Sequence, residues 1–259
     1  MIEIPTDTSV TSHEKPWFEA WFDSDYYHIL YKERNEAEAQ LFLNNLKKVF
    51  NWQPWELILD LACGRGRHAH YLASLGMKVT GIDLSISSIA FANKITNPQV
   101  KFVVQDMRLP LGINQYNYIL NLFTSFGYFE NEQENILVLQ HIKNALLPNG
   151  YAVIEYMNPH YVVQHLKENE TKVVDDIVFE MSKEVKDIFL LKHIQFVANQ
   201  TLQTHTERVM LIYLEQFLAY FDKVGFTLTN LYGDYNLLPY QANTSPRMIM
   251  VIQKKETAE

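Results

Sequence analysis

The sequence predicts an α/β fold built on a mostly parallel β-sheet. Apolar strand-like runs alternate with helical patterns between residues 50 and 158, and this alternation places helices on both faces of a parallel sheet. Three more strand-like runs follow between residues 179 and 210 with no helix between them. They predict a small antiparallel sheet inserted into the chain. Two closing runs, Phe226–Leu231 and Met248–Gln253, are expected to form an antiparallel edge hairpin.

Each element follows from a local pattern. An amphipathic helix is expected from Glu33 to Phe50, because apolar residues recur there at helical spacing. Strands are expected near 57–61, 78–82, 100–104, 116–122 and 151–156. Helices are expected near 67–75, 86–95, 133–147 and 213–224. Pro148 ends the third of these helices, since the residue before proline resists the helical region. Asn158-Pro159 is a plausible start for another.

Size and composition exclude several functional classes. The chain has 259 residues and a net charge of −8, which disfavours nonspecific nucleic-acid binding. Its one cysteine, Cys63, forms no internal disulfide and fits a reducing compartment. No run approaches the roughly 18 apolar residues of a membrane span, and the first residues lack a signal peptide. The nine histidines show no metal-ligand spacing. We therefore expect a cytoplasmic protein without a metal, a membrane or a nucleic-acid partner. Its oligomeric state is not predicted.

Residues 57–68 combine an apolar run, a glycine-rich turn and the start of a helical pattern. The run ends at Asp60, and Gly64 and Gly66 follow. A strand, a glycine loop and a helix N-terminus in this order let a nucleoside-bearing ligand lie against bare backbone. Asp83 ends the next apolar run, about 20 residues further on, where an acid can accept hydrogen bonds from ribose hydroxyls.

The same loop also fits a dinucleotide fingerprint, since Gly64-x-Gly66-x-x-Ala69 has its spacing. Asp60 favours a different ligand. A carboxylate there would repel an anionic pyrophosphate but suits a cationic ligand group. The alternative for Asp60 is a cap on the helix that follows the loop.

A third motif, Gln-Asp106-Met107, ends the next strand-like run. With Asp60-Leu-Ala-Cys-Gly-Arg-Gly66 and Gly-Ile-Asp83-Leu-Ser before it, and Leu146-Leu-Pro-Asn-Gly150 after it, the chain resembles the class I S-adenosylmethionine-dependent methyltransferases of the small-molecule type. The resemblance implies a Rossmann-like class I methyltransferase sheet, mostly parallel with an antiparallel C-terminal edge hairpin, plus the inserted small antiparallel sheet. It implies S-adenosylmethionine as cofactor and S-adenosylhomocysteine as product.

The resemblance also assigns cofactor-binding residues. They are Asp60, Ala62, Gly64, Gly66, Asp83, Leu84, Asp106, Met107, Asn121, Leu122 and Phe123. An N-terminal lid of about 14–50 would add Tyr27, Tyr31 and Arg34, whose alternative is a solvated helix with buried aromatic residues. The core is expected at about 51–160 and 212–255 of a single domain, with the inserted sheet at about 165–211.

The acceptor should meet the cofactor at the aromatic run 121–129, beyond a strand's carboxyl end. The candidates for acceptor contact are Tyr128, His160 and Arg208. Because side chains alternate along Leu202–Met210, its polar face carries either Thr204, Thr206 and Arg208 or Gln203, His205 and Glu207. If the set with Arg208 faces the cavity, an acidic acceptor is expected. The run lacks the Asn/Asp-Pro-Pro-Tyr/Phe tetrad of the family's base and glutamine methylators, which disfavours DNA-base methylation.

The resemblance predicts methyl transfer to a small-molecule acceptor by in-line displacement, in which alignment of the reactants and exclusion of water supply much of the rate. No residue is identified as a general base. Two alternatives stay open, an NAD(P)-dependent oxidoreductase and a non-catalytic S-adenosylmethionine-binding protein. Asp60 and the lack of a Tyr-x-x-x-Lys pair argue against the oxidoreductase.

Overall fold

The computed structural model describes residues 16–32 and 36–255. A seven-stranded sheet forms its centre, in the order β10-β11-β5-β4-β1-β2-β3. The strands are β1 Leu57–Leu61, β2 Lys78–Asp83, β3 Val100–Val104, β4 Tyr116–Asn121, β5 Leu146–Met157, β10 Phe226–Tyr232 and β11 Arg247–Lys254. The first five pair in parallel, whereas β11 runs antiparallel to both β5 and β10. This confirms the predicted sheet and its edge hairpin.

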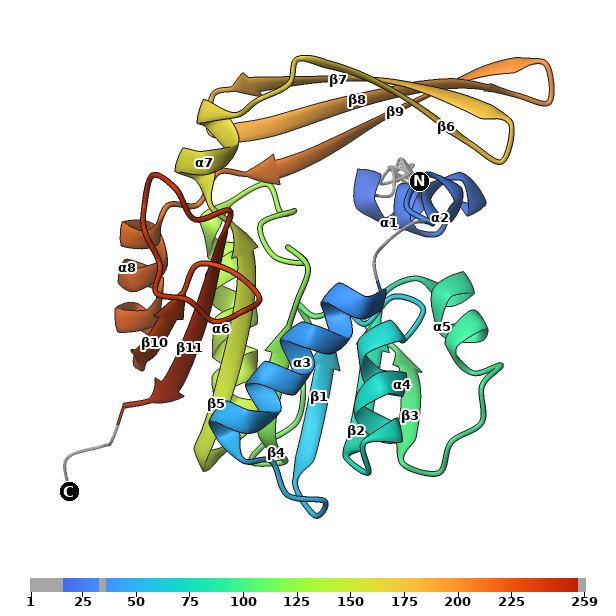
Figure 1. Ribbon diagram of the computed structural model, residues 1–259. Helices are drawn as coiled ribbons and strands as arrows, with labels where there is room; N and C mark the ends of the chain where they lie inside the picture. The colour runs from blue at the N-terminus through green and yellow to red at the C-terminus, as the bar shows by residue number, and fades with distance from the viewer. Residues whose placement is uncertain (1–15, 33–35, 256–259) are drawn as a thin grey trace, which may run out of the picture.

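Helices cover both faces of this sheet (Figure 1). They are α3 Glu36–Phe50, α4 Arg67–Ser74, α5 Ile86–Ala92, α6 Glu132–Ala145 and α8 Leu214–Val224. Leu43 of α3 and Leu72 of α4 pack with Ile58 in one core, and Leu139 of α6 and Phe217 of α8 pack with Leu59 in a second core. Adjacent residues of β1 thus face opposite cores, as expected for a strand buried on both sides.

The direction in which successive strands are added to the sheet reverses between β1 and β4. β2 and β3 lie on one side of β1, whereas β4 and β5 lie on the other. In open α/β sheets, ligands bind beyond the carboxyl ends of the strands at this point. The fold therefore places the glycine loop after β1 and the aromatic run after β4 beside each other.

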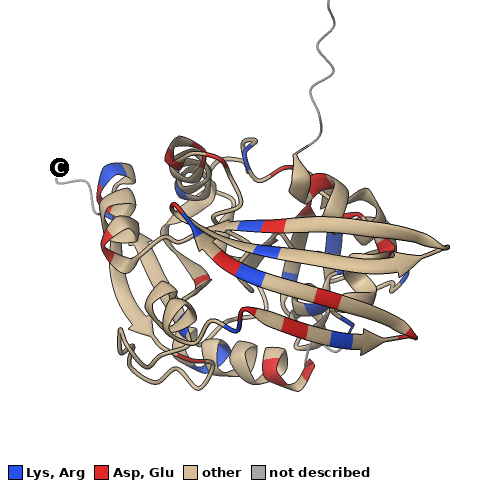
Figure 2. Ribbon diagram, turned by 90° about the horizontal axis from the view of Figure 1, so that it is seen from above, with Lys and Arg blue, Asp and Glu red and all other residues tan. Residues whose placement is uncertain are grey.

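A second sheet lies above this edge (Figure 1). It consists of β6 Asn169–Val174, β7 Ile177–Lys186, β8 Phe189–Ala198 and β9 Thr201–Met210, all antiparallel, and follows α7 Pro159–Gln164. Its underside packs on two short helices, α1 Trp17–Phe22 and α2 Asp25–Leu30, through a core that includes Trp21, Phe179 and Phe196. Seen from above, this sheet carries both basic and acidic residues (Figure 2).

Three details differ from the sequence expectation. β5 begins at Leu146 rather than at 151, because Leu146 already pairs with Tyr116, so α6 ends at Ala145 and Pro148 lies within the strand. The inserted sheet has a fourth strand, β6, which the sequence analysis missed because most of its residues are exposed and polar. Two six-residue helices, α1 and α2, occupy the N-terminal aromatic cluster. Within the described residues, no helix is long and apolar enough to cross a membrane.

Candidate active site

The glycine loop connects β1 to α4 through left-handed backbone positions. Ala62, Gly64 and Gly66 have φ angles of 63°, 54° and 78°. A Cβ on Gly66 would lie 2.6 Å from the Phe102 ring, whereas a Cβ on Gly64 would meet nothing within 4 Å. Packing therefore requires Gly66 to lack a side chain, and Gly64 leaves open space beside a cavity that it lines.

Asp83 holds this loop in place. Its Oδ2 accepts a hydrogen bond from the Gly64 N–H at 2.7 Å, and its Oδ1 accepts one from the Ser85 N–H at 2.8 Å. Ser85 itself caps α5 by accepting the Ser88 N–H, so Asp83 is left to face the cavity. Burial raises the pKa of Asp83, although its backbone hydrogen bonds oppose that shift.

Asp60 occupies a different place from the one expected. Its side chain is only 1% exposed and does not line the cavity, and its carboxylate accepts the backbone N–H of Ala69 in the first turn of α4. A contact with the first turn of α4 agrees with the capping alternative, although Gly66 occupies the N-cap position itself. Burial is the main reason that the pKa of Asp60 rises to about 7, and the nearby Asp83 charge adds to it.

This placement predicts an unusual pH dependence of stability. Asp60 ionises near pH 3.8 in the unfolded chain but only near pH 7 in the folded chain, so its contribution to stability is complete below pH 4 and is lost as the pH rises through 7. Asp60→Asn keeps an oxygen for the Ala69 N–H and removes this loss. We expect the variant to gain about 2.6 kcal/mol of unfolding free energy at pH 8 relative to pH 5, because about a third of the loss has already occurred at pH 5.

Urea denaturation at the two pH values measures this gain. Asp222→Asn is a suitable control, because Lys255 lowers the pKa of the exposed Asp222 and that residue does not titrate in this window. Equal pH dependence in the wild type and in Asp60→Asn would show that Asp60 is ionised throughout.

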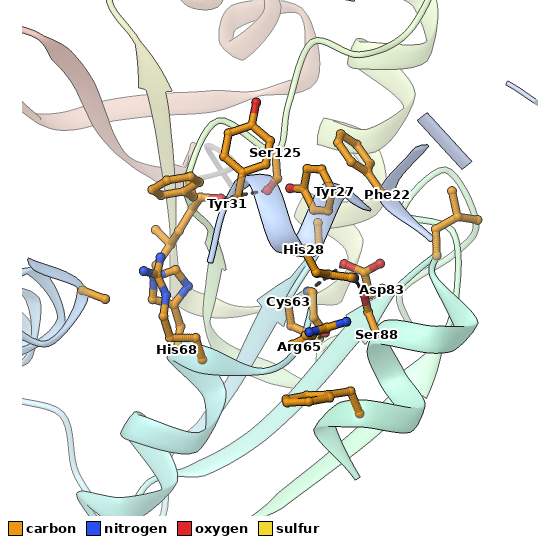
Figure 3. A pocket seen from close by; sticks show the side chains of 18 of the residues that line it. Phe22, Tyr27, His28, Tyr31, Cys63, Arg65, His68, Asp83, Ser88 and Ser125 are labelled. Carbon is orange, nitrogen blue, oxygen red and sulfur yellow. Dashed lines mark hydrogen bonds between the residues drawn. The ribbon is translucent and has the colours of Figure 1, made fainter. Parts of the chain in front are cut away.

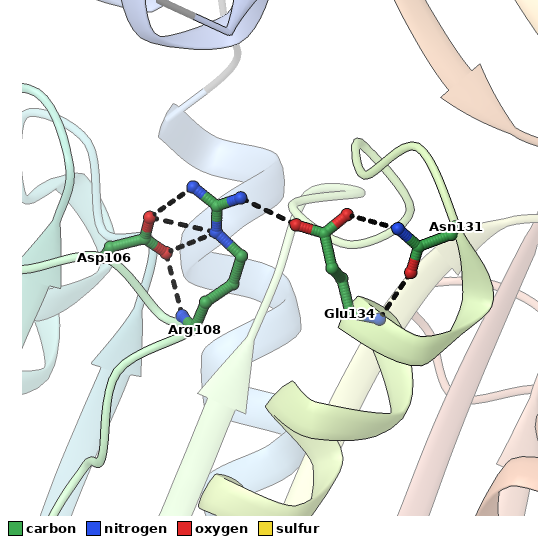
Figure 4. Close-up of polar contacts among 4 residues, drawn as sticks. All are labelled: Asp106, Arg108, Asn131 and Glu134. Atoms are coloured by element: carbon green, nitrogen blue, oxygen red, sulfur yellow. Dashed lines mark hydrogen bonds and ion pairs between the residues drawn. The ribbon is translucent and has the colours of Figure 1, made fainter. Parts of the chain in front are cut away.

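Asp106 lines the cavity, but its carboxylate is already engaged (Figure 4). It receives the Arg108 side chain at 2.7 to 3.2 Å and the Arg108 backbone N–H at 2.8 Å, which lowers its pKa against the effect of burial. Arg108 also donates to Glu134 at 2.7 Å, and Glu134 pairs with Asn131. A ligand amino group would have to share Asp106 with Arg108. The neighbouring Met107 faces the cavity as well.

The cavity has a volume of about 750 Å³ and lies between the glycine loop and the N-terminal helices (Figure 3). This size is typical of a site for a cofactor and a small ligand. The predicted residues in its lining are Ala62, Gly64, Asp83, Leu84, Asp106, Met107, Leu122, Phe123, Tyr27, Tyr31 and Tyr128. Gly66 packs beneath the loop, and Asn121 is fully buried with its amide donating to the Leu61 carbonyl at 3.1 Å. Arg34 lies outside the described residues.

The roof of the cavity comes from β9 and the N-terminal helices. Glu207 lines the cavity and accepts hydrogen bonds from Trp21 Nε1 and from the Tyr31 hydroxyl, both at 2.8 Å. Lys192 on β8 donates to the same hydroxyl at 2.8 Å, and burial lowers its pKa. This set of contacts joins the inserted sheet to α1 and α2.

Two of the predicted acceptor contacts lie elsewhere. Arg208 stacks on Phe189, with 3.9 Å from its guanidinium carbon to the ring centre, and pairs with Glu130 at 3.3 Å. His160 contacts Tyr213. Neither is in the cavity lining. The acidic acceptor was expected only if the Arg208 set faced the cavity, so that expectation does not apply.

Several residues in or beside the site were not predicted from the sequence. The sequence left open whether Glu207 or the adjacent Arg208 faces the cavity. Glu155 was overlooked, although an acid within the apolar run Val153–Met157 is a feature that points to a buried partner. Arg65 and Arg67 also line the cavity.

Comparisons with known proteins agree with this geometry. Residues 58–150 match the family described as "Methyltransferase domain". The chain is 27% identical over 214 residues to the "Putative methyltransferase YqeM" of Bacillus subtilis (strain 168), covering 77% of this chain and 85% of the relative. It is 32% identical over 99 residues to the "dTDP-3-amino-3,6-dideoxy-alpha-D-glucopyranose N,N-dimethyltransferase" of Streptomyces fradiae, covering 38% of each.

The fold is also similar to solved structures. A S-adenosylmethionine-dependent methyltransferase from Clostridium acetobutylicum superposes with a TM-score of 0.76 at 15% identity, covering 89% of this chain and 96% of that one. The matched domain runs from β1 into β5 and thus contains the parallel strands whose carboxyl ends open into the cavity. The chain therefore contains a methyltransferase domain at residues 58–150 and has the fold of the S-adenosylmethionine-dependent methyltransferases.

Proposed function

We propose that this enzyme methylates a small molecule that carries an amine, held in the cavity under the four-stranded sheet. The observation that carries the proposal is the orientation of β9, which turns the carboxylate of Glu207 toward the cavity and Arg208 away from it. A carboxylate accepts hydrogen bonds from an amine and attracts an ammonium group, whereas it repels an acidic acceptor.

The cofactor is proposed to lie along the glycine loop. Because Gly64 has no side chain and the space beside it is open, the cofactor could approach the Gly64 backbone closely. The Asp83 carboxylate would accept hydrogen bonds from two ribose hydroxyls. Leu122 and Phe123 would flank it, and Tyr27 and Tyr31 would cover it from the lid. When bound, S-adenosylmethionine supplies an electrophilic methyl group on a positively charged sulfur.

The chain's own residues would then align the acceptor and exclude water. The Phe22 ring contacts the rings of Tyr27 and Tyr128 beside the cavity. Together these rings would shield a bound acceptor from water. Glu207 would hold the acceptor nitrogen and take up a proton that leaves it. Alignment of this kind supplies much of the rate in a displacement reaction.

The Streptomyces fradiae relative is named for dimethylation of an amino sugar. That name supports a nitrogen acceptor for this chain and does not identify the molecule. We expect radiolabelled methyl transfer from S-adenosylmethionine to a panel of small amines and nucleotide-linked amino sugars. Transfer to acidic metabolites should be slower.

Glu207→Gln tests the acceptor site. The amide retains one acceptor for Trp21 or Tyr31 but loses the charge, so the KM for the amine should rise about tenfold, since charged hydrogen bonds contribute about 1.5–3 kcal/mol. Arg208→Met is the matched control, because it changes the adjacent residue on the outer face and should leave this KM unchanged. Methylation of DNA, RNA, protein or acidic metabolites alone would refute the proposal.

A further inference from the structure

A carboxylate lies in the centre of the main sheet. Glu155 is on β5 between β4 and β11, and its exposed fraction is 0%, like those of its neighbours Ile154 and Tyr156. An unpaired charge at such a position is strongly disfavoured, so Glu155 must have partners that compensate for its burial.

The partners are backbone groups and two side chains. The N–H groups of Phe123 and Thr124 both donate to Oε2 of Glu155, the second at 3.2 Å. On the other oxygen, Oε1, Arg247 of β11 pairs at 3.3 Å and the Tyr235 hydroxyl donates at 3.4 Å. The carboxylate therefore joins β11 to the turn that follows β4.

That turn has a strained backbone. Phe123 and Thr124 are consecutive residues with φ angles of 63° and 54°. Non-glycine residues rarely adopt this left-handed region, and for the β-branched threonine it is a genuine outlier. The backbone carbonyl of Glu155 also accepts the Thr124 N–H at 3.2 Å, and Arg247 donates to the Thr124 hydroxyl at 3.2 Å. Strain persists only where the surroundings hold it in place.

The strained turn forms part of the cavity wall. Leu122, Phe123 and Ser125 line the cavity, and the guanidinium of Arg67 lies 5.3 Å from the centre of the Phe123 ring. We infer that Glu155 is a positioning residue, which fixes the left-handed turn at 123–124 and thereby shapes the wall against which the cofactor binds. The inference rests on the proposed placement of the cofactor beside this turn.

Glu155→Gln is the first test, with the full chain and S-adenosylhomocysteine as the probe. The glutamine side chain has one acceptor oxygen, and its NH2 group would face other hydrogen-bond donors. It therefore cannot accept hydrogen bonds from both backbone N–H groups and from Arg247 at the same time. Amide exchange at Phe123 and Thr124 should accelerate at least about tenfold, and calorimetric affinity for S-adenosylhomocysteine should fall about tenfold.

A second substitution separates positioning from general stability. Glycine adopts left-handed angles without steric cost, so Thr124→Gly in the Glu155→Gln background should restore most of the affinity. Gln200→Gly is the matched control, since Gln200 has a φ of 63° in the remote hairpin between β8 and β9. It should restore nothing.

Lys143→Met is a further control, because it removes a charged hydrogen bond to the Val224 carbonyl at the other end of the sheet. It should lower the melting temperature and leave the affinity unchanged. If Glu155→Gln does not fold, Arg247→Gln provides the same test with the carboxylate in place, and the same faster exchange and weaker binding are expected.

Slow exchange at both amides in Glu155→Gln, or equal rescue by the two glycines, would overturn the inference. These results are distinct from a failure of the proposed function. If the wild type does not bind S-adenosylhomocysteine, the placement of the cofactor is wrong, while amide exchange at residues 123 and 124 still reports whether Glu155 holds the turn.

Discussion

Asp83→Ala is expected to weaken binding of S-adenosylhomocysteine by about 10- to 100-fold. A buried carboxylate that accepts two ribose hydroxyls contributes about 1.5–3 kcal/mol for a hydrogen bond to a charged group, and each 1.4 kcal/mol is a factor of ten. The substitution also leaves the N–H groups of Gly64 and Ser85 without their acceptor. The unfolding free energy should therefore fall by about 1–3 kcal/mol, so affinity must be measured well below the melting temperature.

Asp23→Ala provides the matched control. The Asp23 carboxylate accepts the Ser85 hydroxyl at 2.7 Å and the Ser87 N–H at 2.9 Å, so it supports the same turn without lining the cavity. Isothermal titration calorimetry should give the wild-type affinity for this variant. Wild-type affinity in Asp83→Ala would show that Asp83 only organises the loop.

Alanine substitutions at the two loop glycines should affect different properties, namely cofactor affinity at Gly64 and stability at Gly66. Gly64→Ala costs only the left-handed strain, about 1 kcal/mol, because its Cβ meets no protein atom. The new methyl group would instead occupy the space assigned to the cofactor, and affinity for S-adenosylhomocysteine should fall at least about tenfold. Thermal denaturation should show a small change in stability.

Gly66→Ala should mainly destabilise the fold. Its Cβ would lie 2.6 Å from Phe102 and 3.2 Å from the Cβ of Ala92, and overpacking of this kind costs about 1–3 kcal/mol in addition to the strain. A loss of stability in Gly64→Ala as large as that in Gly66→Ala would contradict the open space at Gly64.

The sheet could be predicted because its inner strands, such as β1 and β4, are buried on both faces and leave unbroken apolar runs in the sequence. β6 could not, since a mostly exposed edge strand has no such run. The helices α1 and α2 are too short for a helical period to show, and their aromatic residues are held by contacts with the inserted sheet.

The site was predictable to the level of motifs. Spacing identified Asp60 and Asp83 as a pair, but the path of the loop determines which carboxylate faces the cavity, and only Asp83 does. The alternation of side chains along β9 divides its residues into two sets, but the sequence does not indicate which set faces the cavity. The packing of Trp21 against that strand decides it in favour of Glu207. Glu155 is a tertiary partner of a distant turn, which no local pattern reveals.

Calorimetric titration of the full chain with S-adenosylhomocysteine and, separately, with NADH tests the central claim most directly. We predict micromolar binding of S-adenosylhomocysteine at one site and no heat with NADH. At 100 times its dissociation constant, the ligand should also add about 2.7 kcal/mol to the unfolding free energy. Binding of NADH with no binding of S-adenosylhomocysteine would contradict the assignment of the cavity as a methyltransferase cofactor site.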